Sequence, residues 1–326
     1  MKNRFLKYIA LAISSLLAPL CISCNANSNN KMKIITTIFP EYDWVMNVLG
    51  DKKDNFDVSM LLDSGIDLHS YAPTPKDIVS ISSCDLFVYV GGESDEWVDD
   101  VLKEAKNKEM KVINLMEILG DKAKEEEIIE GMEGEEEEEE EGEEEGPEYD
   151  EHVWLSLNNS ELFIQAISDN LSTLDKDNAN YYKGNADTYI NNLKALDAEY
   201  KDAVSKANKD TLLFADRFPF RYLVDDYSLK YYAAFIGCSA ETEASVETMS
   251  FLVNKVNELN LKVILKIESS DGKIAETVKK NANNSEEITI LTMDSIQSAS
   301  TKEYAGGRNY LSMMQSNLEV LKKALS

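Results

Sequence analysis

The two histidines of this 326-residue chain, His69 and His152, are the side chains whose chemistry stands out. Imidazole is the commonest metal-binding side chain, and its neutral form suits zinc, copper, iron and nickel. His69 lies in the run GIDLHSY at 65–71, and His152 lies in the run YDEHVWL at 149–155. We interpret both runs as metal-binding segments.

Acidic side chains follow predicted strands in the second half of the chain. Asp216 comes directly after a strand at 211–215, and Asp294 comes directly after one at 287–293. His69 similarly follows a strand that ends at 62. Because an open α/β sheet binds ligands at the carboxyl ends of its strands, we expect His69, His152, Asp216 and Asp294 to meet in a cleft. Four protein ligands saturate a tetrahedral site, whereas catalytic zinc keeps one position open, so this set predicts capture and not catalysis.

Strands and helices alternate twice along the chain, and this alternation predicts an α/β fold. Parallel sheets covered by helices on both faces follow from such alternation. We therefore predict two (β/α)4-type lobes, one at 32–175 and one at 209–326. The predicted strands are 33–38, 57–62, 85–90 and 111–115, then 211–215, 231–235, 262–267 and 287–293. The predicted helices are 41–49, 75–82 and 96–106, then 246–259, 273–280 and 310–324.

A long helix at 176–208 is predicted to connect the lobes. The segment lacks proline, and the apolar side chains of Tyr189, Leu193, Leu196 and Tyr200 recur on one helical face. About 30 residues would span ~45 Å, which is enough to run along both lobes. The alternative is two shorter helices with a break near Gly184.

The amino terminus is typical of an export signal. Positive residues precede an apolar stretch at 8–20, which is too short to cross a membrane comfortably. The stretch resembles a bacterial lipoprotein signal at 1–24, in which Cys24 becomes lipid-modified, followed by a tether at 25–31. An ordinary secretory signal is the alternative. The mature chain is expected outside the cytoplasm, held to the membrane by its lipid anchor.

The net charge of −27 is concentrated in one segment. Residues 125–151 contain 18 Asp or Glu and no Lys or Arg, which is two thirds of the net charge. We expect a disordered acidic loop at 122–149, either collecting cations beside His152 or simply solvated. The remaining body is mildly acidic, so nucleic-acid binding is not expected. Cys84 and Cys238 are expected as buried thiols or as an inter-domain bridge.

Three segments together resemble the metal-binding solute receptors of ABC transporters, the zinc and manganese family. They are GIDLHSY at 65–71, DEHVWL at 150–155 and LTMDSI at 291–296. The resemblance extends over the mature chain and includes the long helix. It implies a monomeric receptor, not an enzyme, that captures a divalent metal ion and delivers it to a membrane permease.

The third ligand segment departs from this family pattern. Family members place His or Glu three residues before a Phe-x-Tyr, and here Phe220-Arg221-Tyr222 puts Arg217 at that position. Arginine stays protonated and has no lone pair for a metal. We therefore expect Asp216 as the third ligand, by a slip of one residue. A strand-end cap is the other interpretation of Asp216. Glu243 and Glu268 are the substitutes.

Zinc is favoured over manganese, because two imidazoles suit zinc even though two carboxylates suit manganese. A surface adhesin or interaction lipoprotein with a structural metal is an alternative. A metal-dependent hydrolase is less consistent with the sequence, which has no HExxH motif and no nucleophile elbow.

Overall fold

The computed structural model describes residues 31–63, 65–134, 148–239 and 243–326. Residues 32–326 form one compact unit. The predicted signal at 1–24, Cys24 and the tether up to residue 30 lie outside the described residues. None of the helices in the described ranges combines the length and the apolar character that a membrane span requires.

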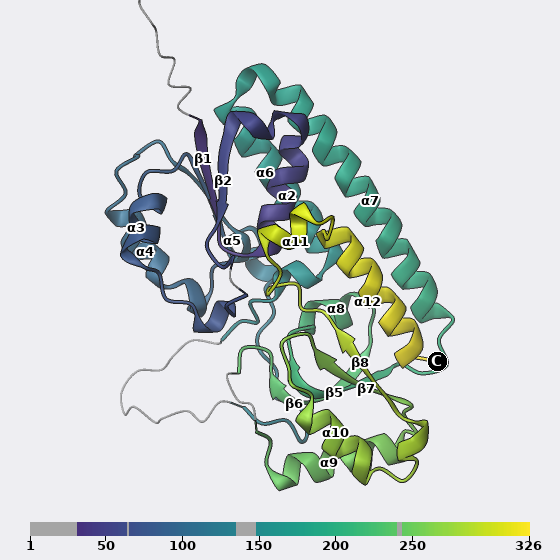
Figure 1. The fold of residues 1–326 in the computed structure, drawn as a ribbon. Coiled ribbons are helices and arrows are strands. Elements are labelled where there is room, and N and C mark those ends of the chain that lie inside the picture. The colour runs from purple at the N-terminus through teal and green to yellow at the C-terminus, as the bar shows by residue number, and fades with distance from the viewer. Residues whose placement is uncertain (1–30, 64, 135–147, 240–242) are drawn as a thin grey trace, which may run out of the picture. The chain divides into compact units, whose positions relative to one another are not determined.

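The N-terminal lobe contains a parallel sheet with the strand order β2-β1-β3-β4. Its strands are β1 (Met32–Thr36), β2 (Phe56–Met60), β3 (Leu86–Tyr89) and β4 (Lys111–Asn114). Its helices are α2 (Phe39–Leu49), α3 (Pro75–Ile81), α4 (Trp97–Lys103), α5 (Leu115–Leu119) and α6 (Leu157–Leu174). In Figure 1, α3 and α4 lie on one side of this sheet, and α2 and α6 lie on the other.

The C-terminal lobe repeats this topology with the order β6-β5-β7-β8, again parallel. Its strands are β5 (Thr211–Phe218), β6 (Lys230–Ile236), β7 (Val263–Ile267) and β8 (Thr289–Met293). Its helices are α8 (Arg221–Asp226), α9 (Val246–Glu258), α10 (Lys273–Asn281), α11 (Thr301–Ala305) and α12 (Tyr310–Ala324). The predicted α/β fold with two parallel sheets is therefore confirmed.

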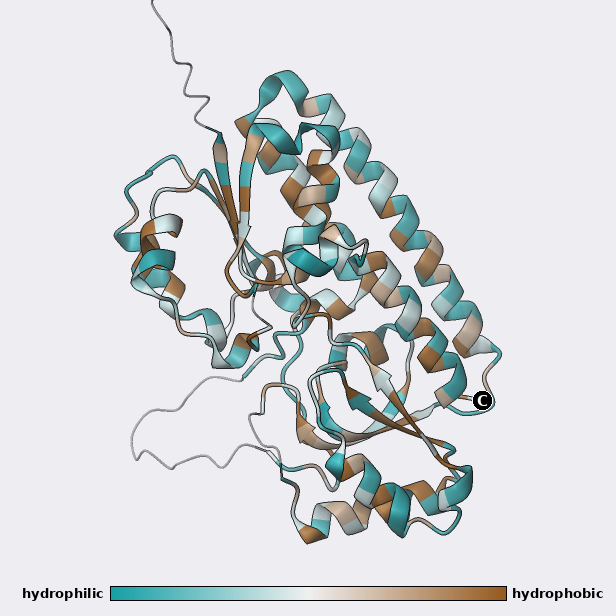
Figure 2. Cartoon of the chain, in the orientation of Figure 1, coloured by the Kyte–Doolittle hydropathy of each residue, from teal (hydrophilic) through white to brown (hydrophobic). Residues whose placement is uncertain are grey.

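Alternation of buried side chains explains why helices cover both faces of each sheet. Successive side chains of a strand point to opposite faces. In β1, Ile34 packs in the core shared with α2 and α6, whereas Ile35 packs with Phe87 against α3 and α4. Figure 2 shows the strands and the inner helix faces as the hydrophobic parts of the ribbon.

The connecting helix α7 (Ala179–Ser205) is continuous over 27 residues, so there is no break at Gly184. At 1.5 Å per residue it spans ~40 Å and runs beside both lobes (Figure 1). The Tyr189 hydroxyl donates to Asp43 of α2 at 2.7 Å, and the Tyr200 hydroxyl donates to the Met314 carbonyl of α12 at 2.6 Å. The same helix is therefore fastened to both lobes.

The acidic segment, for which the sequence predicts a disordered loop over 122–149, forms backbone pairs where the structure describes it. The Glu126 amide donates to the Glu148 carbonyl at 2.9 Å, and Glu133 forms a parallel bridge with Phe235 of β6. Met132 is buried. Backbone pairing and one apolar anchor thus outweigh the charge repulsion at this end of the segment. Residues 135–147 lie outside the described residues.

Candidate metal centre

His69 is positioned by the loop that follows β2. It lies in a short 3-10 helix, η2 (Leu68–Ser70), which begins after Asp67, and the Asp67 carboxylate accepts the His69 backbone N–H at 3.2 Å. The Nδ1 atom of His69 lies 2.9 Å from Ser94 Oγ and 3.4 Å from Glu151 Oε2. The other ring nitrogen, Nε2, is therefore the one available to bind a metal ion.

His152 precedes a second 3-10 helix, η5 (Val153–Leu155), and its side chain is fully buried. Asp150 Oδ1 accepts the His152 backbone N–H at 2.8 Å and lies 3.3 Å from its Nδ1. The Trp154 ring packs beside the imidazole, with the ring centroids 5.2 Å apart. A carboxylate therefore holds Nδ1 in this ring too, which is the usual support for a metal-binding histidine.

The two imidazoles converge on one point. Their Nε2 atoms are 3.2 Å apart. Two nitrogens bound to one tetrahedral zinc at about 2.0 Å would be ~3.3 Å apart, so this spacing fits a shared ion. In the tautomer that carries each proton on Nδ1, towards Ser94 and Glu151 in His69 and towards Asp150 in His152, the two Nε2 lone pairs face each other. That arrangement is favourable only when a cation or a proton lies between them.

Electrostatics at the pair follow the same logic. Burial opposes a charged imidazole, but the Glu151 carboxylate raises the pKa of His69 above its ordinary value. Burial likewise opposes a charged Glu151, but contacts with His69 and Ser94 hold the pKa of Glu151 below its usual range. The surroundings of His69 therefore favour positive charge at its imidazole, whether it comes from a proton or from a metal.

A third possible ligand comes from the other lobe. Among the described residues, His69, His152 and Cys238 form a group whose ligand atoms all lie within 4.8 Å of one another. Cys238 follows β6, and burial, then the Asp150 and Glu126 carboxylates, raise the pKa of its thiol well above the ordinary value. Cys84 is a buried free thiol and Cys238 is also free, so the alternative of a bridge between them is not observed.

Asp216 and Asp294 are not members of this group, and both carboxylates are engaged within their own lobe. Asp216 accepts the backbone N–H groups of Arg217 at 3.0 Å and Ile267 at 3.2 Å. Asp294 pairs with Arg308 and accepts the Ile296 N–H at 2.8 Å. Burial, then the charge of Glu268, raises the pKa of Asp294 to about 6. Asp216 lies within β5, which extends to Phe218 and is longer than the strand predicted at 211–215, so its carboxylate accepts backbone N–H groups inside the sheet and not beyond the strand end.

The two substitute residues are also directed elsewhere. Glu268 accepts the Ser295 N–H at 2.8 Å and the hydroxyls of Ser295 at 2.7 Å and Ser298 at 2.9 Å. Glu243 is exposed. In this arrangement Glu268 orders the loop after β8 and has no role at the imidazole pair.

Arg217 stands where the receptor pattern has its third ligand, although Asp216 was the ligand expected in this chain, and it bridges the two lobes. Its guanidinium pairs with Asp67, two residues before His69, and donates to the Ser239 carbonyl at 3.2 Å. The Gln297 amide donates to the same Asp67 carboxylate at 3.1 Å. The guanidinium therefore connects the loop that carries His69 with the loop that carries Cys238.

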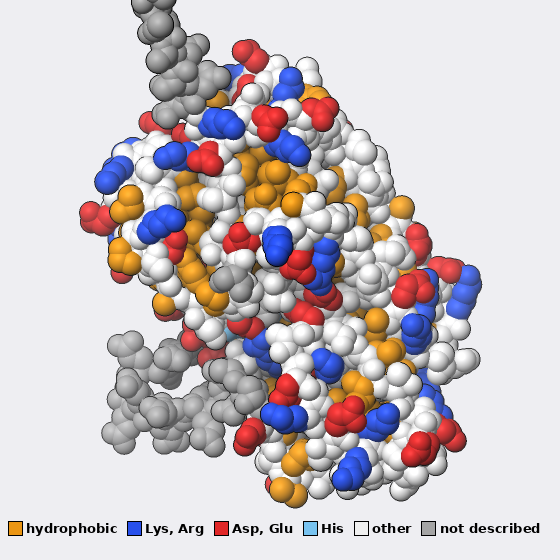
Figure 3. Space-filling model, in the orientation of Figure 1, with side chains coloured by type: hydrophobic (Ala, Val, Ile, Leu, Met, Phe, Trp, Pro, Cys, Tyr) orange, Lys and Arg blue, Asp and Glu red, His pale blue; other side chains and the backbone are white. Residues whose placement is uncertain are grey.

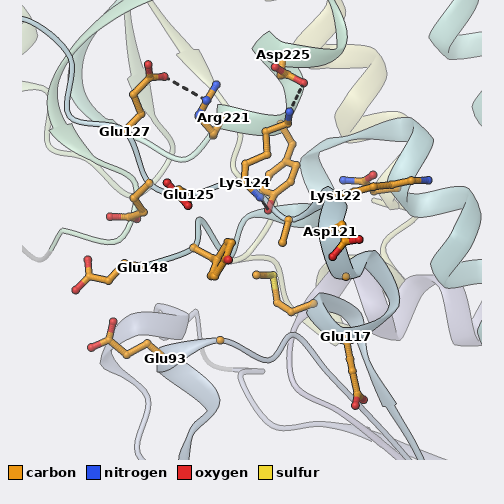
Figure 4. Close-up of a pocket in the computed structure, with 18 of the residues that line it drawn as sticks. Glu93, Glu117, Asp121, Lys122, Lys124, Glu125, Glu127, Glu148, Arg221 and Asp225 are labelled. Atoms are coloured by element: carbon orange, nitrogen blue, oxygen red, sulfur yellow. Dashed lines mark hydrogen bonds and ion pairs between the residues drawn. The ribbon is translucent and has the colours of Figure 1, made fainter. Parts of the chain in front are cut away.

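A polar cavity of about 1740 Å³ lies at the described part of the acidic segment. Ten Asp or Glu and three Lys or Arg line it. Figure 4 shows Lys124 directed at Asp225 and Arg221 directed at Glu127, with ion-pair distances of 2.7 and 3.2 Å. Glu126 also lines this cavity, beside Cys238, and burial raises its pKa to about 7. The carboxylates are in excess, so the cavity favours cations.

Charges on the molecular surface agree with the composition. On the face seen in Figure 3, acidic and basic side chains of the described residues are interspersed, without a broad basic patch on that face. A nucleic-acid backbone requires such a patch. The surface in this view therefore gives no support to nucleic-acid binding.

The chain has two lobes, each built on a parallel sheet, one long helix fastened to both, and a pair of imidazoles between the lobes. Together these features define a metal-binding solute receptor. The model of the family ZnuA, described as zinc-uptake complex component A, periplasmic, matches residues 34–324. This match extends over most of the sequence, and the chain belongs to that family.

Individual relatives agree with the family assignment. The zinc uptake protein ZnuA of Bacillus subtilis is 32% identical over 300 residues, which cover 92% of this chain and 89% of that protein. The zinc-binding lipoprotein AdcA of Streptococcus pneumoniae is 30% identical over 324 residues, which cover 98% of this chain. The chain spans 61% of that AdcA and 56% of its Streptococcus pyogenes counterpart.

A solved structure extends the likeness to three dimensions. The Zn(II)-bound ZnuA-like domain of Streptococcus pneumoniae AdcA has a TM-score of 0.70 and 28% identity, with 90% of this chain and 99% of that chain covered. The fold predicted from the sequence, including its long helix, is the fold of these receptors.

Sequence reasoning missed Cys238, the supporting carboxylates and the bridging role of Arg217. A signal for Cys238 was present, because it follows the strand predicted at 231–235 just as His69 follows the strand ending at 62. The strand-end argument was applied to His69 and to acidic residues, but not to cysteine. The contacts of Asp150 and Glu151 with the rings depend on the tertiary fold.

Proposed function

We propose that this chain is the extracytoplasmic receptor of an ABC zinc importer. It captures a zinc ion and presents it to a membrane permease. Family membership and the zinc-binding relatives support the class of cargo. The observation that carries the proposal for this chain is the 3.2 Å separation of the two Nε2 atoms.

His69 and His152 are the primary zinc ligands in this proposal. Each offers Nε2 while a carboxylate or hydroxyl holds its Nδ1, so little reorganisation is needed when the ion arrives. Zinc needs neutral imidazole, so binding displaces any proton that the pair shares. The engaged carboxylates of Asp216 and Asp294 argue against a place for them among the ligands in this conformation.

Location and delivery are part of the same proposal. If Cys24 is lipid-modified, as the lipoprotein interpretation predicts, its lipid would hold the receptor at the outer side of the membrane, next to its permease. Stable anchoring needs more than one acyl chain, which a lipid-modified cysteine can supply. The carboxylate-rich cavity beside the acidic segment would raise the local concentration of cations.

Metal titration of the purified chain tests this function. We expect one zinc ion per chain in competition with a chromophoric chelator, and manganese should compete poorly with it. A His69→Ala/His152→Ala variant should lose zinc, while Asp216→Ala, at the carboxylate held by backbone amides, should retain it. Unchanged zinc binding in the double-histidine variant would refute the proposed site.

A cellular experiment tests delivery. Deleting the coding sequence should reduce zinc accumulation under zinc limitation, and the wild-type chain should restore it. A chain with Cys24→Ala serves as the variant for the anchor and should restore less. Normal zinc accumulation in the deletion strain would contradict the receptor function.

A further inference from the structure

We propose that the Cys238 thiolate is the third zinc ligand, supplied by the C-terminal lobe. The inference rests on the proposed function and specifies the ligand set of that site. The metal centre is then a His-His-Cys site, with two ligands from the N-terminal lobe and one from the C-terminal lobe. Cys238 takes the place of the two carboxylates expected from the sequence.

Geometry is the first argument. The Cys238 sulfur lies with both imidazoles in a group whose ligand atoms are all within 4.8 Å of one another. Zinc–sulfur bonds of about 2.3 Å and zinc–nitrogen bonds of about 2.0 Å place sulfur and nitrogen ~3.5 Å apart, so the thiol would move towards the imidazoles by up to ~1.3 Å on binding. The carboxylates of Asp216, within β5, and of Asp294, directly after β8, are outside it.

The residue before Cys238 is the second argument. A Cβ at Gly237 would lie 3.0 Å from Cε1 and 3.1 Å from Nδ1 of His152, and 2.9 Å from the Phe218 carbonyl oxygen. The missing side chain lets the end of β6 lie directly against the buried imidazole. This close approach of backbone and ring is what brings the thiol to the histidine pair.

Arg217 provides the third argument. One side of its guanidinium donates to the Ser239 carbonyl, next to Cys238, and the other pairs with Asp67, near His69. Guanidinium cannot ligate a metal. The side chain at the expected ligand position therefore holds the two ligand loops together, and the neighbouring loop supplies the donor atom.

A thiolate ligand would also determine which metal the site prefers. Thiolate is a soft ligand that suits zinc, whereas manganese prefers carboxylates and other oxygen ligands. Coordination forms a zinc–sulfur bond, breaks the S–H bond and releases that proton to solvent. A His-His-Cys site therefore discriminates against manganese more strongly than a His-His-Asp-Asp site would.

Cobalt substitution reports on the thiolate directly. In the full chain carrying Cys21→Ser and Cys24→Ser, Cys84 and Cys238 are the remaining thiols. Loading with Co(II) should produce thiolate-to-cobalt charge-transfer absorption in the near ultraviolet, and one equivalent of zinc should abolish it. The absorption should persist in Cys84→Ser, the matched control, and disappear in Cys238→Ser.

Affinity measurements complete the test. Removing the support of a metal ligand lowers affinity about 10- to 100-fold, so losing a ligand in Cys238→Ser should lower zinc affinity by at least about 100-fold. Cys238→Asp should narrow the preference for zinc over manganese. Circular dichroism checks the fold of each variant. The cobalt spectrum of the parent chain, which carries only Cys21→Ser and Cys24→Ser, tests the thiolate ligand even if Cys238→Ser does not fold.

The two proposals fail in different ways. Tight zinc binding without charge-transfer absorption in the parent chain would overturn the thiolate ligand and leave the receptor function intact. Failure to bind either zinc or cobalt would overturn both. Equal zinc affinity in Cys238→Ser and Cys84→Ser would also exclude Cys238 as a ligand.

Discussion

Polar side chains lie near the carboxyl ends of strands in both lobes, but the two sets differ in the lone pairs that they leave available. In the N-terminal lobe, neighbouring groups hold Nδ1 of His69 and of His152 and leave Nε2 exposed to the other ring. In the C-terminal lobe, Asp216 and Asp294 are already satisfied by backbone amides and by Arg308. A position at a strand end brings a side chain near a site, and a spare lone pair is what makes it a ligand.

The largest effect should come from removing both imidazoles. Each direct ligand should be worth more than the 10- to 100-fold of a supporting residue, so His69→Ala/His152→Ala should lower zinc affinity by more than ~10⁴-fold. Chelator competition measures this loss. The matching C-terminal variant, Asp216→Asn/Asp294→Asn, should lose less than about 10-fold. A larger loss in the aspartate pair than in the histidine pair would reverse the comparison.

Asp43 is a buried carboxylate without an ion pair among the described residues, in contrast to Glu151 beside His69. Burial raises the pKa of Asp43 to about 7, against the hydrogen bonds from Tyr189 and Asn47 that lower it. The folded state therefore holds this proton more tightly than the unfolded state. The resulting stabilisation is full below the ordinary pKa of 3.8 and is lost as the pH rises through about 7.

Asp43→Asn should remove this pH dependence, because the amide oxygen can still accept from Tyr189. The variant should be more stable than the parent above pH ~7, by an upper limit of ~4 kcal/mol, and similar to it near pH ~4. Urea unfolding at several pH values measures the difference. Parallel stability curves for the two chains would show that Asp43 ionises normally.

The carboxylates beside the rings should matter next. Asp150→Asn and Glu151→Gln keep an oxygen acceptor near each Nδ1 but remove its charge. We expect zinc affinity to fall about 10- to 100-fold in each, as is typical for the supports of metal-binding histidines. Lys103→Gln, at an exposed ion pair, is a control that should change nothing. Full affinity in both carboxylate variants would show that ring orientation does not depend on them.

The smallest effect concerns the helix that both lobes share. A Cβ at Gly184 would meet no atom within 4 Å. Gly184→Ala should therefore raise the free energy of unfolding by ~0.5–1 kcal/mol through its better helix propensity. Zinc affinity should be unchanged, because α7 contributes no ligand. Lower stability in denaturant unfolding would indicate that the backbone at Gly184 is strained.

Regular patterning explains why the sequence could predict the fold and the histidine pair. Alternation of strands and helices defined two parallel sheets, and the uninterrupted apolar face around Leu193 and Leu196 defined α7. His69 and His152 were identifiable because their runs stand beside predicted strands and helices. These features are local, and local pattern is what a sequence displays directly.

Competition between partners explains what the sequence could not predict. Whether Asp294 faces a metal or Arg308 depends on residues brought together by tertiary packing. The role of Arg217 depends in the same way on Asp67, which is 150 residues away along the chain. Glu133 showed no signal of its pairing beside a polyglutamate region, because its partners Ala234 and Phe235 belong to β6.

The bridge between Glu133 and Phe235 has a consequence for assembly. β6 is the outermost strand of its sheet, and unpaired outer strands invite pairing with strands of other molecules. The segment around Glu133 covers part of this edge strand and brings negative charge to it. Backbone pairing and negative charge at Glu133 would thus make it less favourable for this sheet to pair with the sheet of another molecule.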